Sequence, residues 1–292
     1  MQLIGYLIKL IFWVIVTVAF LYSFLTHFIL WVELRLLAAS NTEQANAVTS
    51  HPWSKLLKSF VVEFGCTILN ILMYPLRFIP KEQKQTRNVY SPSAIPVLFV
   101  HGYLHNQMAW FWFTRHLQKK PEIGPLYSIN LFPPIASISE LAEQLKDKIN
   151  DIQIETGSSQ VILIGHSMGG IVSSYYCEYL AKAKEVAMVI TLGSPFKGTR
   201  IAALGAGQSA KEMFPNSLFL TELSSLIQQS SIPYYSIASK IDNIIVPWQS
   251  ALLSDESATR TQLILEDYGH LRLLISPVVI DQVAEWISTG NH

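Results

Sequence analysis

Charged residues are scarce in this chain. Only 14% of its 292 residues are Asp, Glu, Lys or Arg, and half are hydrophobic, whereas about 25% charged residues is usual in soluble domains. This composition excludes a disordered chain and argues against a purely soluble protein. Basic and acidic residues number 21 each, so no net field attracts nucleic acid, and no nucleic-acid partner is expected.

Cysteine is also scarce. The only two, Cys66 and Cys177, lie far apart in the sequence, and no CxxC or other Cys/His spacing of a metal site occurs. The sequence therefore predicts neither a disulfide framework nor a zinc module. Both cysteines are expected to be small buried residues. We expect no metal and no organic cofactor.

An uncharged apolar run extends from Leu10 to Val32. As a helix it would be ~35 Å long, enough to cross the hydrocarbon core of a bilayer. A cleaved signal peptide, with a usual apolar region of about 7–15 residues after a basic start, and a buried soluble helix are the alternatives. We expect residues 1–33 to be a retained, single-pass membrane anchor. Lys9 and Arg35 flank the run on opposite sides, so its orientation stays open.

A second apolar segment runs from about residue 53 to residue 79, and its polar residues fall within ~80° of one another on a helical wheel. They are Ser59, Glu63, Thr67, Asn70 and Arg77. The pattern predicts an amphipathic helix that ends or kinks at Pro75. It could lie at the membrane interface, pack on the following domain, or cross the membrane at the cost of burying Glu63 and Arg77 in lipid. Residues 81–94 are polar and aperiodic, so 34–93 is expected to be this helix and a linker.

From residue 94 onward, short apolar runs alternate with helical patterns. Strands are expected at 96–100, 126–131, 161–164, 186–192, 234–238 and 263–265, and helices at 107–119, 138–155, 169–183 and 278–287. Ser137 and Glu140 have the spacing of a capping box. The alternation predicts an α/β fold, a mostly parallel sheet with helices on both faces, preceded by the transmembrane helix.

The strand pattern is interrupted at about residues 199–232, within the catalytic domain expected at 94–292. Apolar residues recur with helical spacing between Phe214 and Ile227. This segment is expected to cap the strand ends. Two interpretations stay open: a mobile lid over an acyl pocket, or a fixed cover for the core.

Residues 165–170, GHSMGG, directly follow an expected strand and lead into a helix. This is the G-x-S-x-G nucleophile elbow in its expected context. So tight a turn strains the backbone of Ser167, and Gly165 and Gly169 avoid side-chain clashes across it. The side chain of His166, within the elbow, is expected to point away from a substrate. The pattern predicts Ser167 as a catalytic nucleophile.

A serine hydroxyl needs a base near neutral pH. His270 follows the last expected strand and precedes the final helix, the place of the base in the order Ser, acid, His. Asp242 lies in the loop after the strand at 234–238, whereas Asp255 lies far into the next connection and Asp267 is only three residues from His270. The sequence therefore predicts Asp242 as the acid that fixes the imidazole tautomer.

An acyl-transfer site also needs an oxyanion hole. The N–H of Met168, next to the nucleophile, is one expected donor. The N–H of Tyr103 is the other, because Gly102 lets that loop approach closely; His101 and His105 are expected to shape the site. An aromatic block follows at 110–113 and is expected to pack in the core, to line an acyl pocket or to touch the membrane.

The segments PVLFVHGY at 96–103, GHSMGG, TLGSPFKGT at 191–199, the loop 242–247 and GHLRLLISPVV at 269–279 resemble the α/β-hydrolase superfamily over residues ~94–289. They are most similar to its bacterial lipase/esterase branch and to GPI-inositol-deacylase-like hydrolases. The resemblance implies the α/β-hydrolase fold and a serine ester hydrolase whose triad is Ser167, Asp242 and His270.

Together these features predict a membrane-anchored lipase or esterase of a bacterial inner membrane. It would cleave carboxylic esters of lipid-like substrates through an acyl-enzyme. Acyltransferases and thioesterases share the scaffold, so both stay open as alternatives. A noncatalytic membrane scaffold is a third, disfavoured by the intact triad and both elbow glycines.

Overall fold

The computed structural model describes residues 2–39, 53–78, 94–253 and 259–290. Nearly all of the expected linker, and Asp255, lie outside these ranges. Six strands form one all-parallel sheet in the order β2-β1-β3-β4-β5-β6. Their bounds are β1 Val97–Val100, β2 Leu126–Ser128, β3 Val161–His166, β4 Val186–Leu192, β5 Tyr234–Ser239 and β6 Arg260–Leu265. All six expected strands are confirmed.

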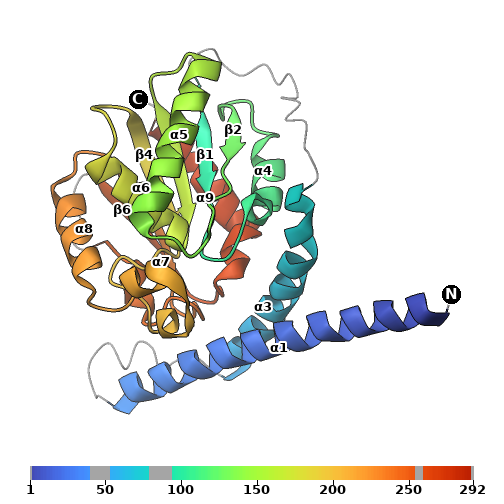
Figure 1. The fold of residues 1–292 in the computed structure, drawn as a ribbon. Coiled ribbons are helices and arrows are strands. Elements are labelled where there is room, and N and C mark those ends of the chain that lie inside the picture. The colour runs from blue at the N-terminus through green and yellow to red at the C-terminus, as the bar shows by residue number, and fades with distance from the viewer. Residues whose placement is uncertain (1, 40–52, 79–93, 254–258, 291–292) are drawn as a thin grey trace.

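Helices cover both faces of the sheet (Figure 1). One face packs against α5 Ile138–Thr156, α6 Met168–Tyr179 and α8 Leu218–Gln229. The other packs against the short helix η2 Gln107–Trp110, α4 Phe111–Leu117, η5 Leu271–Leu274 and α9 Pro277–Thr289. Every residue of β1 and β3 is buried, as a strand covered on both faces requires. The predicted α/β class with helices on both faces is confirmed.

The predicted capping box begins α5. The N–H of Glu140 donates to Ser137 Oγ at 3.2 Å, and the N–H of Ser137 donates to Glu140 Oε2 at 3.0 Å. Gly157 ends the helix in the left-handed conformation, at φ 71°, where a side chain would be strained. Local sequence signals therefore define both ends of this helix.

The segment expected to cap the strand ends forms η3 Arg200–Leu204, α7 Gly207–Glu212 and α8. In α8, Leu220, Leu223 and Ile227 are buried in the core cluster that also contains α6. The apolar helix expected at 214–227 therefore packs on the core. The two interpretations of the segment 199–232, a mobile lid or a fixed cover, both stay predictions.

Two long helices precede the sheet domain: α1 Gln2–Ala39 and α3 Trp53–Met73, which continues as η1 Tyr74–Phe78. Each is long and apolar enough to cross a membrane. The α-helical part of the second ends two residues before Pro75, whose ring disfavours helical backbone in the residue before it. Of the three arrangements that the sequence leaves open for this segment, the structure has α3 packed on the domain, with Cys66 in the core cluster of α9.

The two parts of α1 differ in their surroundings. Residues 2–14 are all exposed, and Figure 1 shows this end projecting away from the domain. In the second part, buried residues recur every three or four positions: Ala19, Ser23, Thr26, Leu30 and Glu33. Such spacing places one stripe of the helix against its neighbours. The run expected to span the membrane, 10–32, therefore includes a part that packs against protein.

Candidate active site

The carboxyl ends of the strands bring the predicted site residues together. Tyr103 follows β1, Ser167 follows β3, Asp242 follows β5 and His270 follows β6. Because all strands are parallel, these ends meet at one edge of the sheet. Tyr103, Ser167 and His270 line one cavity of about 630 Å³, and Asp242 lies behind His270.

Ser167 lies at a sharp turn between β3 and α6. Its φ of 55° and ψ of −125° are a strained backbone conformation for a residue with a side chain. A Cβ on Gly165 would lie 2.4 Å from the N atom of Gly170, and one on Gly169 would lie 2.1 Å from the O atom of Val100. Only glycine fits at these two positions. This confirms that Gly165 and Gly169 are needed to avoid side-chain clashes across the turn.

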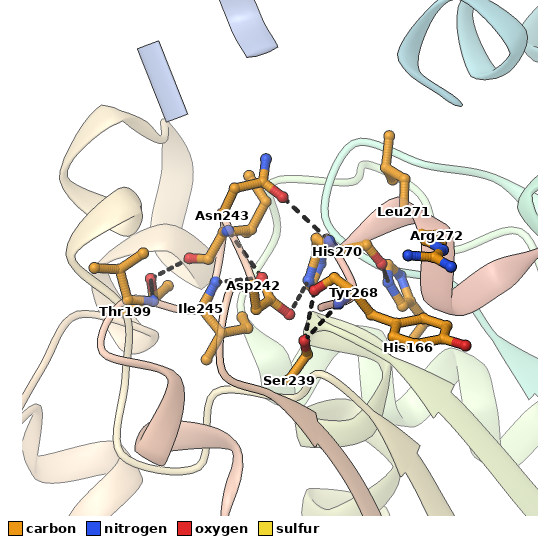
Figure 2. A network of polar contacts seen from close by, with 12 residues as sticks. His166, Thr199, Ser239, Asp242, Asn243, Ile245, Tyr268, His270, Leu271 and Arg272 are labelled. Carbon is orange, nitrogen blue, oxygen red and sulfur yellow. Dashed lines mark hydrogen bonds and ion pairs between the residues drawn. The ribbon is translucent and has the colours of Figure 1, made fainter. Parts of the chain in front are cut away.

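His270 and Asp242 form a buried pair (Figure 2). His270 Nδ1 lies 2.9 Å from Asp242 Oδ2. Asp242 Oδ1 accepts the N–H groups of Ile244 and Ile245, each at 2.8 Å. These donors orient the carboxylate, which in turn holds the proton of the imidazole on Nδ1. The other ring nitrogen, Nε2, is then left as a proton acceptor.

Two side chains hold the loops on either side of this pair. The N–H of His270 donates to Asn243 Oδ1 at 3.1 Å, and Asn243 Nδ2 donates to the hydroxyl of Thr26 in α1 at 2.9 Å. Ser239 Oγ donates to the O atom of Tyr268 at 2.6 Å and accepts its N–H at 3.1 Å. The backbone around His270 is thus held from β5 and, through Asn243, from the N-terminal helix. Figure 2 shows the contacts of Ser239 and Asn243 with this loop.

Glu63 of α3 also reaches this loop. Its Oε2 accepts the N–H of Leu271 at 3.0 Å, and its Oε1 accepts the N–H of Arg272 at 2.8 Å. Burial raises the pKa of Glu63 to about 7, and the two backbone hydrogen bonds oppose that shift. Sequence reasoning assigned Glu63 to the polar face of an amphipathic helix and missed this contact, because a residue 207 positions before His270 gives no local signal of it.

The loop after β1 lies directly against Ser167. A Cβ on Gly102 would be 3.0 Å from Ser167 Cβ. His101 Nδ1 donates to the O atom of Gly102 at 2.8 Å, and its Nε2 accepts the N–H of Leu131 at 2.9 Å. Burial lowers the pKa of His101 to about 4, so a neutral ring supports the loop. This agrees with the expectation that His101 shapes the site.

Both expected oxyanion donors lie near Ser167. Met168 follows it in the chain, and Tyr103 belongs to the loop that packs against it. Met168 is the first residue of α6, so its N–H has no acceptor within the helix. Tyr103 follows Gly102, and its hydroxyl donates to the O atom of Ala206 at 2.7 Å and accepts the N–H of the same residue at 2.8 Å. These contacts tie the loop to the cap. The donor roles of the two N–H groups stay predictions.

His166, the residue before Ser167, packs against His270, and the expectation that its side chain points away from a substrate stays a prediction. Its ring centroid lies 4.4 Å from that of His270, its Nε2 donates to the O atom of His270 at 3.2 Å, and it lines the cavity. Side chains alternate along a strand, so His166 lies on the same face of β3 as Ile162 and Ile164, beneath His270. Burial lowers the pKa of His166. The ring of His105 stacks on that of His166, and burial lowers the pKa of His105 to about 3.

Sequence reasoning also missed Gly193, in the loop after β4. A Cβ there would lie 3.0 Å from Asp242 Oδ2 and 3.2 Å from His270 Nδ1, and its φ is 55°. The only available signal was its place in the TLGSPFKGT segment. The rival acid Asp267 lies elsewhere, with its carboxylate 3.9 Å from Lys58 Nζ.

Besides the loops that follow the strands, three further parts of the chain line the cavity. These are Val18, Tyr22, Leu25 and Thr26 of α1; Thr67, Asn70, Ile71 and Tyr74 of α3 and η1; and Thr199, Ile201, Ala202, Leu204 and Met213 of the cap. Neither the helix at 214–227 nor the aromatic block at 110–113 lines it; Trp110 and Phe113 are core residues. Among the described residues, no group of three or more His, Cys, Asp or Glu could hold a metal ion.

Comparisons with known proteins agree with this architecture. Residues 135–266 match the family described as PGAP1-like alpha/beta domain. A triacylglycerol lipase of Pseudarthrobacter phenanthrenivorans is 28% identical over 121 residues, 39% of this chain and 37% of the relative. The chain thus spans about a third of the length of the curated relatives that it matches.

Solved structures share the fold. The mature form of a Bacillus licheniformis lipase has a TM-score of 0.58 and 18% identity, covering 68% of this chain and 94% of that one. Aspergillus fumigatus lipase B has a TM-score of 0.59 and 21% identity, covering 68% of this chain and 54% of that one.

The parallel sheet, the nucleophile elbow and these structural likenesses define an α/β-hydrolase fold. The matching sequences support a narrower likeness, because they resemble the lipase/esterase branch of the α/β-hydrolase superfamily.

Proposed function

We propose that this protein is a membrane-anchored serine ester hydrolase that acts on lipid-like carboxylic esters. The observation that carries the proposal is the convergence of a strained serine and a carboxylate-paired histidine on one apolar cavity. Strain at Ser167 keeps its hydroxyl at the cavity wall, and Asp242 orients His270 from behind. This is the arrangement of an activated nucleophile with its base and orienting acid.

In the proposed mechanism, Ser167 Oγ attacks the ester carbonyl carbon while its proton moves to His270 Nε2. The carbonyl oxygen becomes an oxyanion held by the N–H groups of Tyr103 and Met168. When this intermediate collapses, the bond to the alcohol oxygen breaks and the alcohol leaves with the proton from His270. Water then attacks the acyl-Ser167 carbonyl while His270 takes its proton. As the bond between the acyl carbon and Ser167 Oγ breaks, His270 returns this proton to Oγ, and the carboxylic acid leaves.

The substrate class follows from how α1 meets the cavity. Val18, Tyr22 and Leu25 line it where α1 leaves the domain, and residues 2–14 beyond this point expose apolar side chains. A helix of this kind is suited to lie in lipid. An acyl chain could pass from the bilayer along α1 into the cavity without crossing water, and each methylene buried there would contribute ~0.8 kcal/mol.

The test is a chain-length series of esters, from acetyl to long acyl, assayed with the full-length protein in liposomes and in detergent. We expect turnover to rise with chain length up to the capacity of the cavity, and to be higher when the ester is in the bilayer. Best turnover on acetyl esters with no gain from liposomes would contradict the lipid-ester proposal. Analysis of products with an added alcohol would reveal acyl transfer in place of hydrolysis.

A further inference from the structure

Glu63 is an unusual residue for its position. It lies in α3, outside the sheet domain, and only 1% of it is exposed. Its carboxylate receives two backbone N–H groups from the two residues that follow His270. No described cationic side chain pairs with it: the guanidinium of Arg272 donates to the O atom of Asp267 and stacks over Tyr268.

The backbone before His270 is also shaped around Glu63. A Cβ on Gly269 would lie 2.3 Å from Glu63 Cγ and 2.4 Å from Glu63 Oε1, so only glycine allows the carboxylate to come so close. Glu63 therefore contacts the residue before His270 and binds the two residues after it. His270 lies between these contacts, and its own side chain is left free for Asp242.

The geometry explains what the carboxylate contributes. His270 is the N-cap residue of η5, and its side chain makes no capping hydrogen bond. The first N–H groups of a helical turn have no acceptor within it, and Glu63 supplies acceptors for two of them. A buried carboxylate without a cation is costly, as the raised pKa of Glu63 indicates. Buried ionisable groups with shifted pKa values are common at functional sites, where their free-energy cost is tolerated.

We propose that Glu63 is a positioning residue for catalysis, which holds the loop of His270 so that the imidazole meets both Asp242 and Ser167. The inference rests on the proposed role of His270 as the base. It makes α3 a part of the active site's supporting structure, in addition to a helix that packs on the domain.

The test uses the full-length protein and measures the rate constant at which Ser167 reacts with a fluorophosphonate, together with kcat and KM for an ester. In Glu63→Gln, the amide can accept one N–H but turns its own NH₂ toward the other. We expect the rate constant and kcat to fall by ~10–100-fold, as for a displaced catalytic group, with KM changed less than about twofold. Glu63→Asp keeps the charge but shortens the side chain, and should lose less.

The matched control is Ser59→Ala. Ser59 is buried in the same helix, its hydroxyl bonds to His27 of α1 at 3.2 Å, and it does not line the cavity. We expect it to retain the wild-type rate constant. If Glu63 only stabilised the fold, its substitution would lower the fraction of protein that reacts with the probe. The rate constant of the fraction that still reacts would not change. Wild-type rate constants in both Glu63 variants would overturn the inference, whereas an unreactive wild-type Ser167 would overturn the proposed function instead.

Discussion

The sheet domain buries its apolar residues, whereas the first of the N-terminal helices exposes many of them. Every side chain of β1 and β3 is buried, whereas in the first part of α1 the large apolar side chains are exposed. Yet the polar residues Thr26 and Glu63 of these helices are among the most buried in the molecule and contact the loops of the active site. The comparison suggests that chemistry belongs to the sheet domain, while the helices supply location, one cavity wall and support for His270.

The strongest way to test this division is to remove the nucleophile from the sheet domain. Ser167→Ala should lower ester turnover by ~10⁴-fold or more and leave unfolding unchanged, because the small side chain is retained at the strained turn. Steady-state turnover and thermal unfolding in detergent measure the two effects. A variant that keeps a substantial share of the activity would refute Ser167 as the nucleophile.

Removing the charge behind His270 should have the next largest effect. Asp242→Asn replaces an acceptor of the Nδ1 proton, so the wrong tautomer is favoured and kcat should fall on the order of 10³-fold. Asp267→Asn is the control, since Asp267 lies beside Lys58, and it should change kcat little. If Asp267→Asn were the damaging change and Asp242→Asn nearly silent, Asp242 would be the wrong acid.

The buried histidines should make the sheet domain sensitive to acid. The folded state holds the pKa of His101 at about 4, whereas an unfolded histidine has a pKa of about 6.5. Below pH 6.5 His101 binds a proton in the unfolded chain but stays neutral in the folded state. The stability contributed by neutral His101 is therefore present above pH 6.5 and is lost as pH falls toward 4.

Glu63, with its raised pKa, acts in the opposite direction, so the measurement compares wild type with His101→Asn at each pH. The advantage of wild type in free energy of unfolding should shrink by about 2 kcal/mol between pH 6.5 and pH 5. Urea titrations at both pH values measure it. An advantage that is constant or grows on acidification would show that His101 does not remain neutral in the folded state.

The smallest expected effect tests the cavity wall contributed by α1. Leu25→Trp should fill space in the cavity and lower turnover of long-chain esters ~10-fold relative to short ones, because several methylenes would lose their contact. Leu21→Trp makes the same substitution on α1 at an exposed residue outside the cavity and should keep the wild-type preference. Equal chain-length profiles in both variants would show that α1 does not contact the acyl chain.

The sequence predicted the sheet and the catalytic loops well, because their signals are local. The apolar run at 161–164, the glycines at 165 and 169 and the capping box at 137–140 each encode structure within a few residues. His270 and Asp242 could be selected from their order after successive strands, since parallel strands bring those loops to one edge.

Contacts between distant segments could not be predicted. Nothing near Glu63 indicates that it binds the backbone after His270, and nothing in α1 indicates that Thr26 meets Asn243. Nothing near His166 indicates that its ring packs against His270, 104 residues later in the chain. The helix at 214–227 was equally ambiguous, since the same apolar stripe serves a lid or a core cover.

The most direct test of the central claim is labelling of the full-length protein with a fluorophosphonate, followed by mass spectrometry of the modified peptide. The probe phosphonylates a serine that an adjacent base has activated. We expect a single modified residue, Ser167, with labelling lost in Ser167→Ala and strongly slowed in Asp242→Asn. Modification of another residue, or no modification of folded protein, would contradict this expectation.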